Sequence, residues 1–239
     1  REPRFYASVA YNGATWYLLN EPDNANKDKQ IFYYRGSGNG YTNTMFWLRT
    51  GIGVMKFVHP DDTNRDEKDE YIRKKPSIRY AEILLIYAEA LNELTGSYTV
   101  ASWNGETQYT IQRDINEMKK GIQPIRIRAG IPDYTPAEYE DQNLFREKLK
   151  RERQIELMGE GHRYYDIRRW KDADVEESLP IYGCNTLMTE KWKDVFHVPV
   201  AVPSLPTNFS RKMYFWPISH SELKRNKMLT QNPGWTYND

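Results

Sequence analysis

The segment from residue 143 to 170 contains the residue types that a hydrolytic active site would use. A helix over this segment would place Phe145, Leu149, Glu152 and Glu156 on one stripe. Side chains at this spacing lie about 6 Å apart at their base, which falls within the ~5–9.5 Å that separates the paired carboxyl groups of glycosidases. The two glutamates could therefore act as the acid and base of glycoside hydrolysis.

The direction of the two side chains argues against that role. Catalytic carboxyl groups flank the scissile bond from opposite sides, whereas residues four apart on a helix project the same way. Buried carboxylates need cationic partners, and the stretch "GEGHRYYDIRRW" at 159–170 is rich in arginine. We therefore predict a structural ion network. Its expected members are Glu152, Glu156, Glu160, Arg163, Asp166 and Arg169.

This hypothesis predicts an effect on stability rather than on ligand choice. If the network is buried, replacing Arg163 or Asp166 with alanine should cost on the order of 3 kcal/mol. His162, in the same stretch, has no expected catalytic partner.

Other sequence patterns of catalysis or metal binding are missing. The four histidines lack the spacing of zinc ligands, and the sequence contains no G-x-S-x-G motif. The glycine-rich "GSGNG" at 36–40 is not followed by the Lys-Ser/Thr of a phosphate-binding loop. Cys184 is the single cysteine, which excludes an internal disulfide. We expect no enzymatic activity, no cofactor and no metal.

Aromatic residues make up 14% of the chain, and many of those in the first fifty residues lie beside turn residues. An indole or phenol ring can stack on the apolar face of a sugar, while Asn and Arg side chains hydrogen-bond its polar rim. Aromatic residues on loops are more often binding residues than those inside helices. We therefore predict a ligand site here. The candidate residues are Trp16, Trp47, Tyr11, Tyr17, Tyr41, Asn43 and Arg49.

The sequence divides into three regions that would position these residues. Region 1–75 is rich in aromatics and predicts short strands and loops, with Asn12-Gly13 as a turn signal. Region 76–170 is helical, and region 171–239 is irregular and ends in a short helix. A capping box of Ser219 and Glu222 is expected to open that last helix.

The clearest helix is "SIRYAEILLIYAEALNEL", from about Ser77 to Gly96. It is apolar around most of its circumference, so we expect it to be packed on several sides, with Ile83, Leu84, Tyr87 and Leu91 in the core. A helix over 110–128 is expected to be broken at its internal Gly and Pro. This pattern favours stacked helix pairs.

Several segments, in order along the chain, resemble the C-terminal half of the SusD/RagB family, the surface nutrient-binding lipoproteins of Bacteroidetes. "REPRFYASVAYNGATW" is similar to the family's "DPRF…G…W", with Glu2 in place of Asp. "IRIRAGIP" is similar to its "R-x-RAGLP", and "IRYAEILLIYAEALNEL" to its most recognisable helix. "LKRERQIELMGEGHRYYDIRRW" is similar to "R-x-E-R-x-x-E…EG-x-R-x-x-D-x-x-RW", and "FWPISHSEL…QNPGW" to "P-I-P…E…QNPGY".

The resemblance implies a mostly α fold of TPR-like helix pairs, an alpha-alpha superhelix, with a loop-rich region of short strands beside it. It implies that the chain is part of a longer fold, lipid-anchored at the outer face of the outer membrane. The implied partners are an oligosaccharide or polysaccharide and a SusC-like TonB-dependent transporter. With a net charge of +1, the chain has no field that would attract nucleic acid or a membrane surface.

Four hypotheses remain at this point. The first is non-catalytic capture of glycans for uptake, and the second is capture of peptides by a RagB-like member. The third is a glycosidase that uses Glu152 and Glu156. The fourth is a helical scaffold for protein partners, which leaves the aromatic residues outside the helices unexplained.

Overall fold

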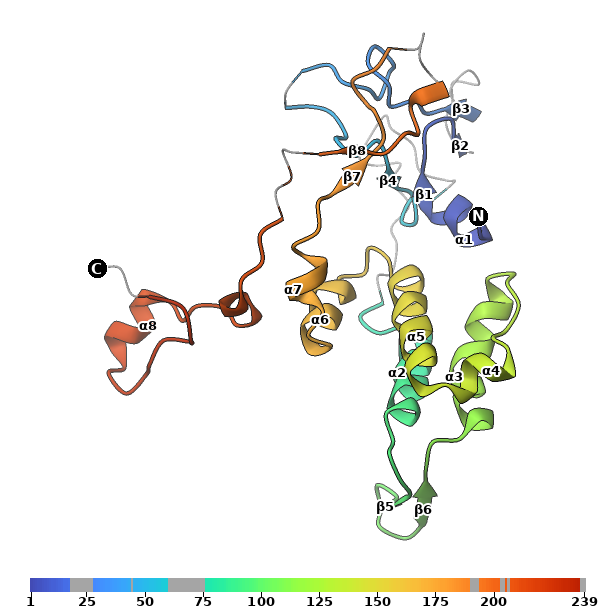
Figure 1. Cartoon of the computed structure of the whole chain (residues 1–239), viewed down its shortest axis with the longest axis vertical. Helices are drawn as coiled ribbons and strands as arrows, with labels where there is room; N and C mark the ends of the chain where they lie inside the picture. Colours follow the sequence, from blue (N-terminus) through green and yellow to red (C-terminus); the bar gives the residue numbers. More distant parts are fainter. Residues whose placement is uncertain are drawn as a thin grey trace. The chain divides into compact units, whose positions relative to one another are not determined.

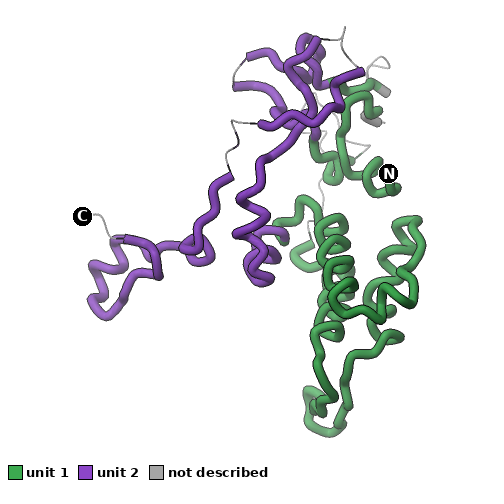
Figure 2. The backbone as a smooth tube through the Cα atoms, in the orientation of Figure 1, with its two compact units in different colours: residues 1–32, 53–162 green, residues 33–52, 163–239 purple. Residues whose placement is uncertain are grey.

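A computed structural model of the chain describes residues 1–17, 28–43, 45–59, 76–189, 194–202, 205 and 207–236, without the side chains of 16, 17 and 28. The chain forms two compact units (Figures 1 and 2). Unit 1 comprises Arg1–Phe32 and Gly53–His162, and unit 2 comprises Tyr33–Ile52 and Arg163–Asp239. The division of the sequence at residues 75 and 170 stays a prediction, because sequence character and compactness are different criteria.

Helices form the core of unit 1. They are α2 (Tyr80–Asn92), α3 (Ile115–Arg128), α4 (Pro136–Glu140) and α5 (Gln142–Glu156), after a short α1 (Pro3–Ser8). Helix α2 packs against α3 and α5, and α4 packs against α5. The buried cluster between them contains Ala81, Leu85, Ala88, Leu91, Met118, Ile122, Ile125, Tyr134, Tyr139, Phe145, Leu149 and Leu157.

Local side-chain contacts fix where these helices begin. The Asp114 side chain accepts a hydrogen bond from the backbone N–H of Glu117 at the start of α3. Thr135 and Glu138 form a capping box at the start of α4. Asp141 caps α5 through the backbone N–H groups of residues 143 and 144.

Helix α3 is continuous through Pro124, so the predicted break is wrong. Its buried residues, including Met118 and Ile122, hold it against α2 and compensate for the hydrogen bond that proline removes. Gly121 permits a close approach of the two helices. A Cβ atom there would lie 2.5 Å from the carbonyl oxygen of Leu84 in α2.

Helix α2 is buried on one face, not on several sides as expected. Leu91 is buried, but Ile83 and Tyr87, which we expected in the core, are exposed together with Ile86. The reason is that α3 and α5 cover only the opposite face, which carries residues such as Leu85. The prediction for Ile83 and Tyr87 was therefore wrong.

The strands among the described residues form separate two-stranded antiparallel pairs. In unit 1, β1 (Val9–Ala10) pairs with β4 (Gly53–Val54), β2 (Thr15–Tyr17) with β3 (Asp28–Gln30), and β5 (Tyr98–Ala101) with β6 (Gln108–Ile111). In unit 2, β7 (Tyr182–Gly183) pairs with β8 (Val200–Ala201).

The remaining helices are short. They are α6 (His162–Arg169), α7 (Ala173–Glu176), the 3-10 helix η3 (Arg211–Tyr214) and α8 (His220–Arg225). Ser219 precedes α8 as expected, but its side chain makes no capping hydrogen bond, so the predicted capping box is wrong. The Ser219 hydroxyl instead lies 3.1 Å from that of Ser221.

Candidate functional site

The loop from residue 33 to 50 in unit 2 is held at both ends by one neighbouring segment. The backbone N–H of Arg35 donates to the Met188 carbonyl oxygen at 2.8 Å, and the backbone N–H of Cys184 donates to the Thr50 carbonyl oxygen at 2.8 Å. At the second anchor the backbones approach closely, because a Cβ atom on Gly183 would lie 2.6 Å from the Thr50 Cα. The loop therefore has a fixed base.

Within this loop, Asn43 shapes the backbone. Its side-chain oxygen accepts hydrogen bonds from the backbone N–H groups of Met45 (2.8 Å) and Phe46 (3.0 Å). The Thr42 hydroxyl donates to the Phe46 carbonyl oxygen at 3.0 Å. Asn43 was predicted to contact a ligand. In the structure its side-chain oxygen orders the turn.

Tyr41 and Trp47 meet edge to face, with ring centroids 5.3 Å apart and an interplanar angle of 82°. The guanidinium group of Arg35 lies over the Tyr41 ring, 5.4 Å from its centroid. Phe46 is exposed beside them, and Arg49 is half-buried just beyond. We refer to the rings of Tyr41 and Trp47 as the aromatic pair of the loop.

The other predicted ligand residues belong to unit 1. Tyr11 stacks on Phe5, with centroids 5.4 Å apart, and meets Tyr6 edge-on at 5.8 Å. Trp16 and Tyr17 contribute backbone to β2, and their side chains lie outside the described part of the structure. The structure thus brings Tyr41, Asn43, Trp47 and Arg49 together on one loop and places Tyr11, Trp16 and Tyr17 in the other unit.

Arg35 and Phe46 belong to this loop as well but were not predicted as site residues. Arg35 follows Tyr33-Tyr34 directly, so the combination of paired aromatics and a cation was a usable signal. Phe46 precedes Trp47 and is more exposed than that residue. No sequence signal separated it from a core phenylalanine.

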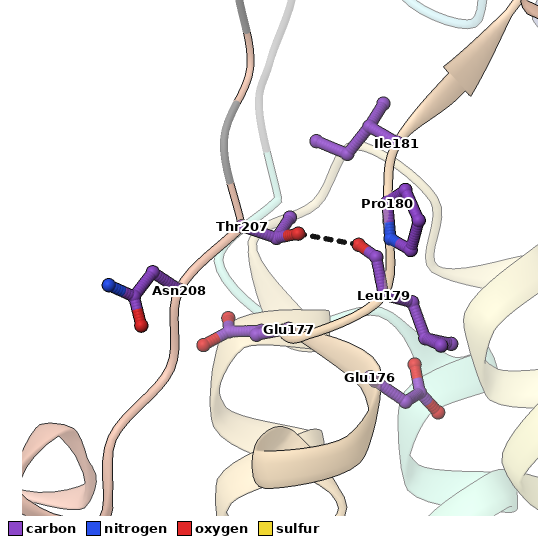
Figure 3. Close-up of a pocket in the computed structure, with 7 residues that line it drawn as sticks. All are labelled: Glu176, Glu177, Leu179, Pro180, Ile181, Thr207 and Asn208. Atoms are coloured by element: carbon purple, nitrogen blue, oxygen red, sulfur yellow. Dashed lines mark hydrogen bonds between the residues drawn. The ribbon is translucent and has the colours of Figure 1, made fainter. Parts of the chain in front are cut away.

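Unit 2 also contains a pocket of about 480 Å³ that was not predicted from the sequence (Figure 3). Its lining residues are Glu176, Glu177, Leu179, Pro180, Ile181, Thr207 and Asn208. The Thr207 hydroxyl donates to the Leu179 carbonyl oxygen at 2.6 Å, which links the two lining segments, 176–181 and 207–208. Glu176 and Glu177 are ion-paired with Arg163 and Arg168, so the pocket does not offer uncompensated negative charge from these two groups.

The carboxylates of α5 lie in an ion network with cations that are distant in sequence. Glu156 is paired with Arg4 (3.2 Å), Arg79 (3.2 Å) and Arg128 (2.6 Å). Glu152 is paired with Arg4 (2.6 Å) and Arg126 (2.7 Å). Both glutamates are buried.

Glu160 extends this network. Arg79 pairs with it at 2.6 Å, and the Lys56 ammonium group donates to its carboxylate. Lys56 also donates to the carbonyl oxygen of Glu156 at 2.8 Å, at the end of α5. The network therefore joins the first residues of the chain, the segment around Lys56, and helices α2, α3 and α5.

Contacts with cations lower the pKa values of Glu156 and Glu160. Burial raises the pKa of Glu156, but hydrogen bonds from Arg128, Arg4 and Arg79 outweigh it and bring the pKa below its ordinary value. Burial acts on Glu160 in the same way, and contacts with Arg79 and Lys56 lower its pKa. A general acid in glycoside hydrolysis needs a raised pKa, so the electrostatics oppose that role for Glu156.

The predicted partners of these glutamates were different. We expected them to pair with Arg163 and Arg169, in one network that also held Asp166, but these three residues belong to unit 2 and have partners there. Arg163 pairs with Glu176, and Arg169 donates to Asp166 at 2.9 Å. The partners of Glu152 and Glu156 come instead from the start of the chain, from Arg79 and from α3.

Arg163 and Asp166 differ in burial, so we expect their replacement with alanine to have different effects on stability. Arg163 and Glu176 are partly exposed, so Arg163→Ala should cost less than about 1 kcal/mol, not the 3 kcal/mol first expected. Asp166 is buried and accepts hydrogen bonds from Arg169, which is 42% exposed, so Asp166→Ala should cost about 1.5–3 kcal/mol. Urea denaturation of both variants measures the difference. Equal losses would contradict this assignment.

Comparison with known proteins identifies the chain. The sequence model of the SusD family matches residues 1–235. The chain belongs to the SusD family.

Individual proteins are also similar to the chain. The chain is 29% identical to SusD-like protein P2 of Formosa agariphila over 176 residues, which are 73% of this chain and 28% of that protein. Among solved structures, BT4246 matches with a TM-score of 0.74 and 25% identity, over 98% of this chain and 36% of that one. A SusD-like protein from Bacteroides fragilis, BF3747, matches with a TM-score of 0.70 and 25% identity, over 98% and 39%.

The predicted fold class, a mostly α SusD-like fold with TPR-like helix pairs, is confirmed by these matches and by the helical core of unit 1. The chain spans less than two-fifths of the length of these SusD-family relatives.

In the part of this SusD-family chain that the structure describes, no helix is long and apolar enough to cross a bilayer. No group of three or more His, Cys, Asp or Glu side chains is placed there to hold a metal ion.

Proposed function

We propose that this SusD-family protein binds oligosaccharides at the cell surface, without hydrolysing them, for uptake through a SusC-like TonB-dependent transporter. The observation that carries the proposal is the aromatic pair Tyr41–Trp47 on an anchored loop, with Arg35 beside it. Membership of the SusD family supports the class of function. The same membership supports a lipid-anchored, outward-facing location at the outer membrane.

The chemistry of the loop suits a sugar. Two rings at right angles offer one face and one edge, so a pyranose can stack on one ring while its hydroxyl groups reach Arg35. The loop is fixed at both ends, so little conformational entropy is lost on binding. A surface loop encloses only part of a ligand, and the affinity is therefore expected to be modest, which suits a protein that must release its ligand to a transporter.

A hydrolytic role finds less support. The carboxylates that were the best candidates, Glu152 and Glu156, are buried and held by Arg4, Arg126 and Arg128, among others. A substrate would have to displace these cations. We therefore propose binding without turnover.

The test is a binding screen that also records products. The protein is presented to a panel of polysaccharides and to a tryptic digest of bacterial protein, and the release of reducing sugar is measured alongside binding. We expect saturable binding to at least one polysaccharide with no release of sugar. Release that disappears in Glu156→Gln with the fold intact would establish a glycosidase instead, and binding to peptides alone would establish the RagB-like alternative.

A further inference from the structure

The hairpin between α2 and α3 has one apolar face that is open to solvent. Strands β5 and β6 pair so that Tyr98 lies opposite Ile111 and Val100 opposite Tyr109. Because side chains alternate between the two faces of a strand, these residues share one face. The other face carries small or polar residues, namely Thr99, Ala101, Gln108 and Thr110.

The most exposed apolar side chains of this hairpin are aromatic. Trp103, at the tip, is 98% exposed, Tyr109 is 53% exposed and Tyr98 is 47% exposed. The aliphatic residues Val100 and Ile111 are less exposed. Each exposed ring carries an O–H or N–H group, so the surface offers flat apolar faces with polar edges and is not purely apolar.

The turn that carries Trp103 is held by its own side chains. The Ser102 hydroxyl donates to the Asn104 side-chain oxygen at 2.6 Å, and the Asn104 amide donates to Glu106 at 2.7 Å. The backbone N–H of Thr107 donates to the Ser102 hydroxyl at 3.0 Å. The indole of Trp103 is therefore presented on a fixed turn, which lowers the entropy that a ligand must overcome.

The low charge of the hairpin favours uncharged ligands. Residues 94–112 contain one charged side chain, Glu106, and no Lys or Arg. Anionic polymers are bound through cations, so nucleic acids and acidic polysaccharides do not match this surface. Exposed aromatic rings surrounded by hydroxyl and amide groups match an uncharged sugar polymer.

We propose that the β5–β6 hairpin is a second binding site for glycans and that it takes uncharged oligosaccharides. The Trp103 indole stacks on a pyranose ring, and Tyr98 and Tyr109 continue the contact along the strands. The ligand class rests on the proposed function, but the site lies in unit 1, whereas the pair Tyr41–Trp47 lies in unit 2.

The experiment follows the indole N–H signals of the whole ¹⁵N-labelled chain by NMR. The signals of Trp103 and Trp47 are identified by their loss in Trp103→Phe and Trp47→Phe. The probes are neutral hexasaccharides of α-1,4-glucan, β-1,3-glucan, β-1,4-xylan and β-1,4-mannan, with oligogalacturonate and oligoguluronate as charged counterparts. We expect at least one neutral probe to shift the Trp103 signal saturably, and Trp103→Ala to weaken that binding roughly tenfold.

The outcomes separate this proposal from the proposed function. If neutral probes shift the Trp47 signal and leave that of Trp103 unchanged, the hairpin site is wrong and the loop site stands. If the Trp103 signal responds only to charged probes, or only to the concentration of the protein itself, the hairpin is not a site for neutral glycans. A response to protein concentration alone would show that the hairpin is a contact between copies of the chain. If no probe in the panel shifts either signal, both proposals fail.

Discussion

Replacing Glu156 with alanine is expected to lower the free energy of unfolding by about 3–5 kcal/mol. Glu156 is buried, and its carboxylate neutralises Arg4, Arg79 and Arg128, which come from three separate segments. Without Glu156, Arg4 keeps Glu152 and Arg79 keeps Glu160, but a partly dry site that holds several cations loses one negative charge. The attachment of the first residues of the chain to α3 and α5 should weaken as well.

Chemical denaturation of the purified variant measures this loss. Glu147 on the same helix is the matched control, because it is 69% exposed and pairs with Lys150 at 3.2 Å. Glu147→Ala should change the free energy of unfolding by less than about 1 kcal/mol. Equal effects of the two substitutions would show that the network does not hold unit 1 together.

The same carboxylates predict how stability depends on pH. The pKa values of Glu156 and Glu160 are lowered in the folded protein, so their contribution is complete above the ordinary value of 4.5. It is lost as the pH falls from 4.5 through the lower folded values, because the unfolded chain then binds protons that the folded chain does not. Glu156→Gln should therefore lose less stability across this range than the unaltered protein does. Parallel pH profiles would contradict the assignment.

The second large effect is expected at the base of the aromatic loop. In Gly183→Val, the new side chain would collide with the backbone of Thr50, where a Cβ atom already lies 2.6 Å from Cα and 2.8 Å from the carbonyl oxygen. Because a backbone cannot rotate away as a side chain can, the anchor must separate. We expect a loss of about 1–3 kcal/mol in stability and a shift of the Trp47 indole signal.

Gly38 provides a control for this substitution within the same loop. A Cβ atom there meets nothing within 4 Å, and its φ lies outside the left-handed region. Gly38→Ala should therefore leave both stability and the Trp47 signal unchanged. If Gly183→Val behaves like Gly38→Ala, the close approach at Thr50 does not fix the loop.

Helical periodicity predicted much of unit 1 correctly. The stripe of Phe145, Leu149, Glu152 and Glu156 is buried on α5, as the spacing required. The network partners could not be predicted, because Arg4 and Arg79 reach the glutamates from positions more than 70 residues away in sequence. Periodicity fixes which face a residue occupies and says nothing of which segment lies opposite.

The loop in unit 2 illustrates the same limit for the site. Aromatic and turn residues between 41 and 49 predicted a ligand surface, and Tyr41 and Trp47 do meet. Composition could not indicate that Tyr11 lies in a different unit, in a ring cluster with Phe5. The β5–β6 hairpin was not predicted, because each strand alternates over four residues and its Asn104-Gly105 pair stands in a longer connection than the usual two-residue turn.

The central claim is that the loop at 33–50 binds the glycan through Tyr41 and Trp47. Isothermal titration of the polysaccharide selected by the binding screen, into the unaltered chain and into Trp47→Ala, tests it most directly. Tyr165→Ala serves as a control in unit 2, because Tyr165 is an exposed aromatic outside the loop. The account predicts that Trp47→Ala weakens binding at least roughly tenfold while Tyr165→Ala does not. Unchanged affinity in a folded Trp47→Ala variant would contradict it.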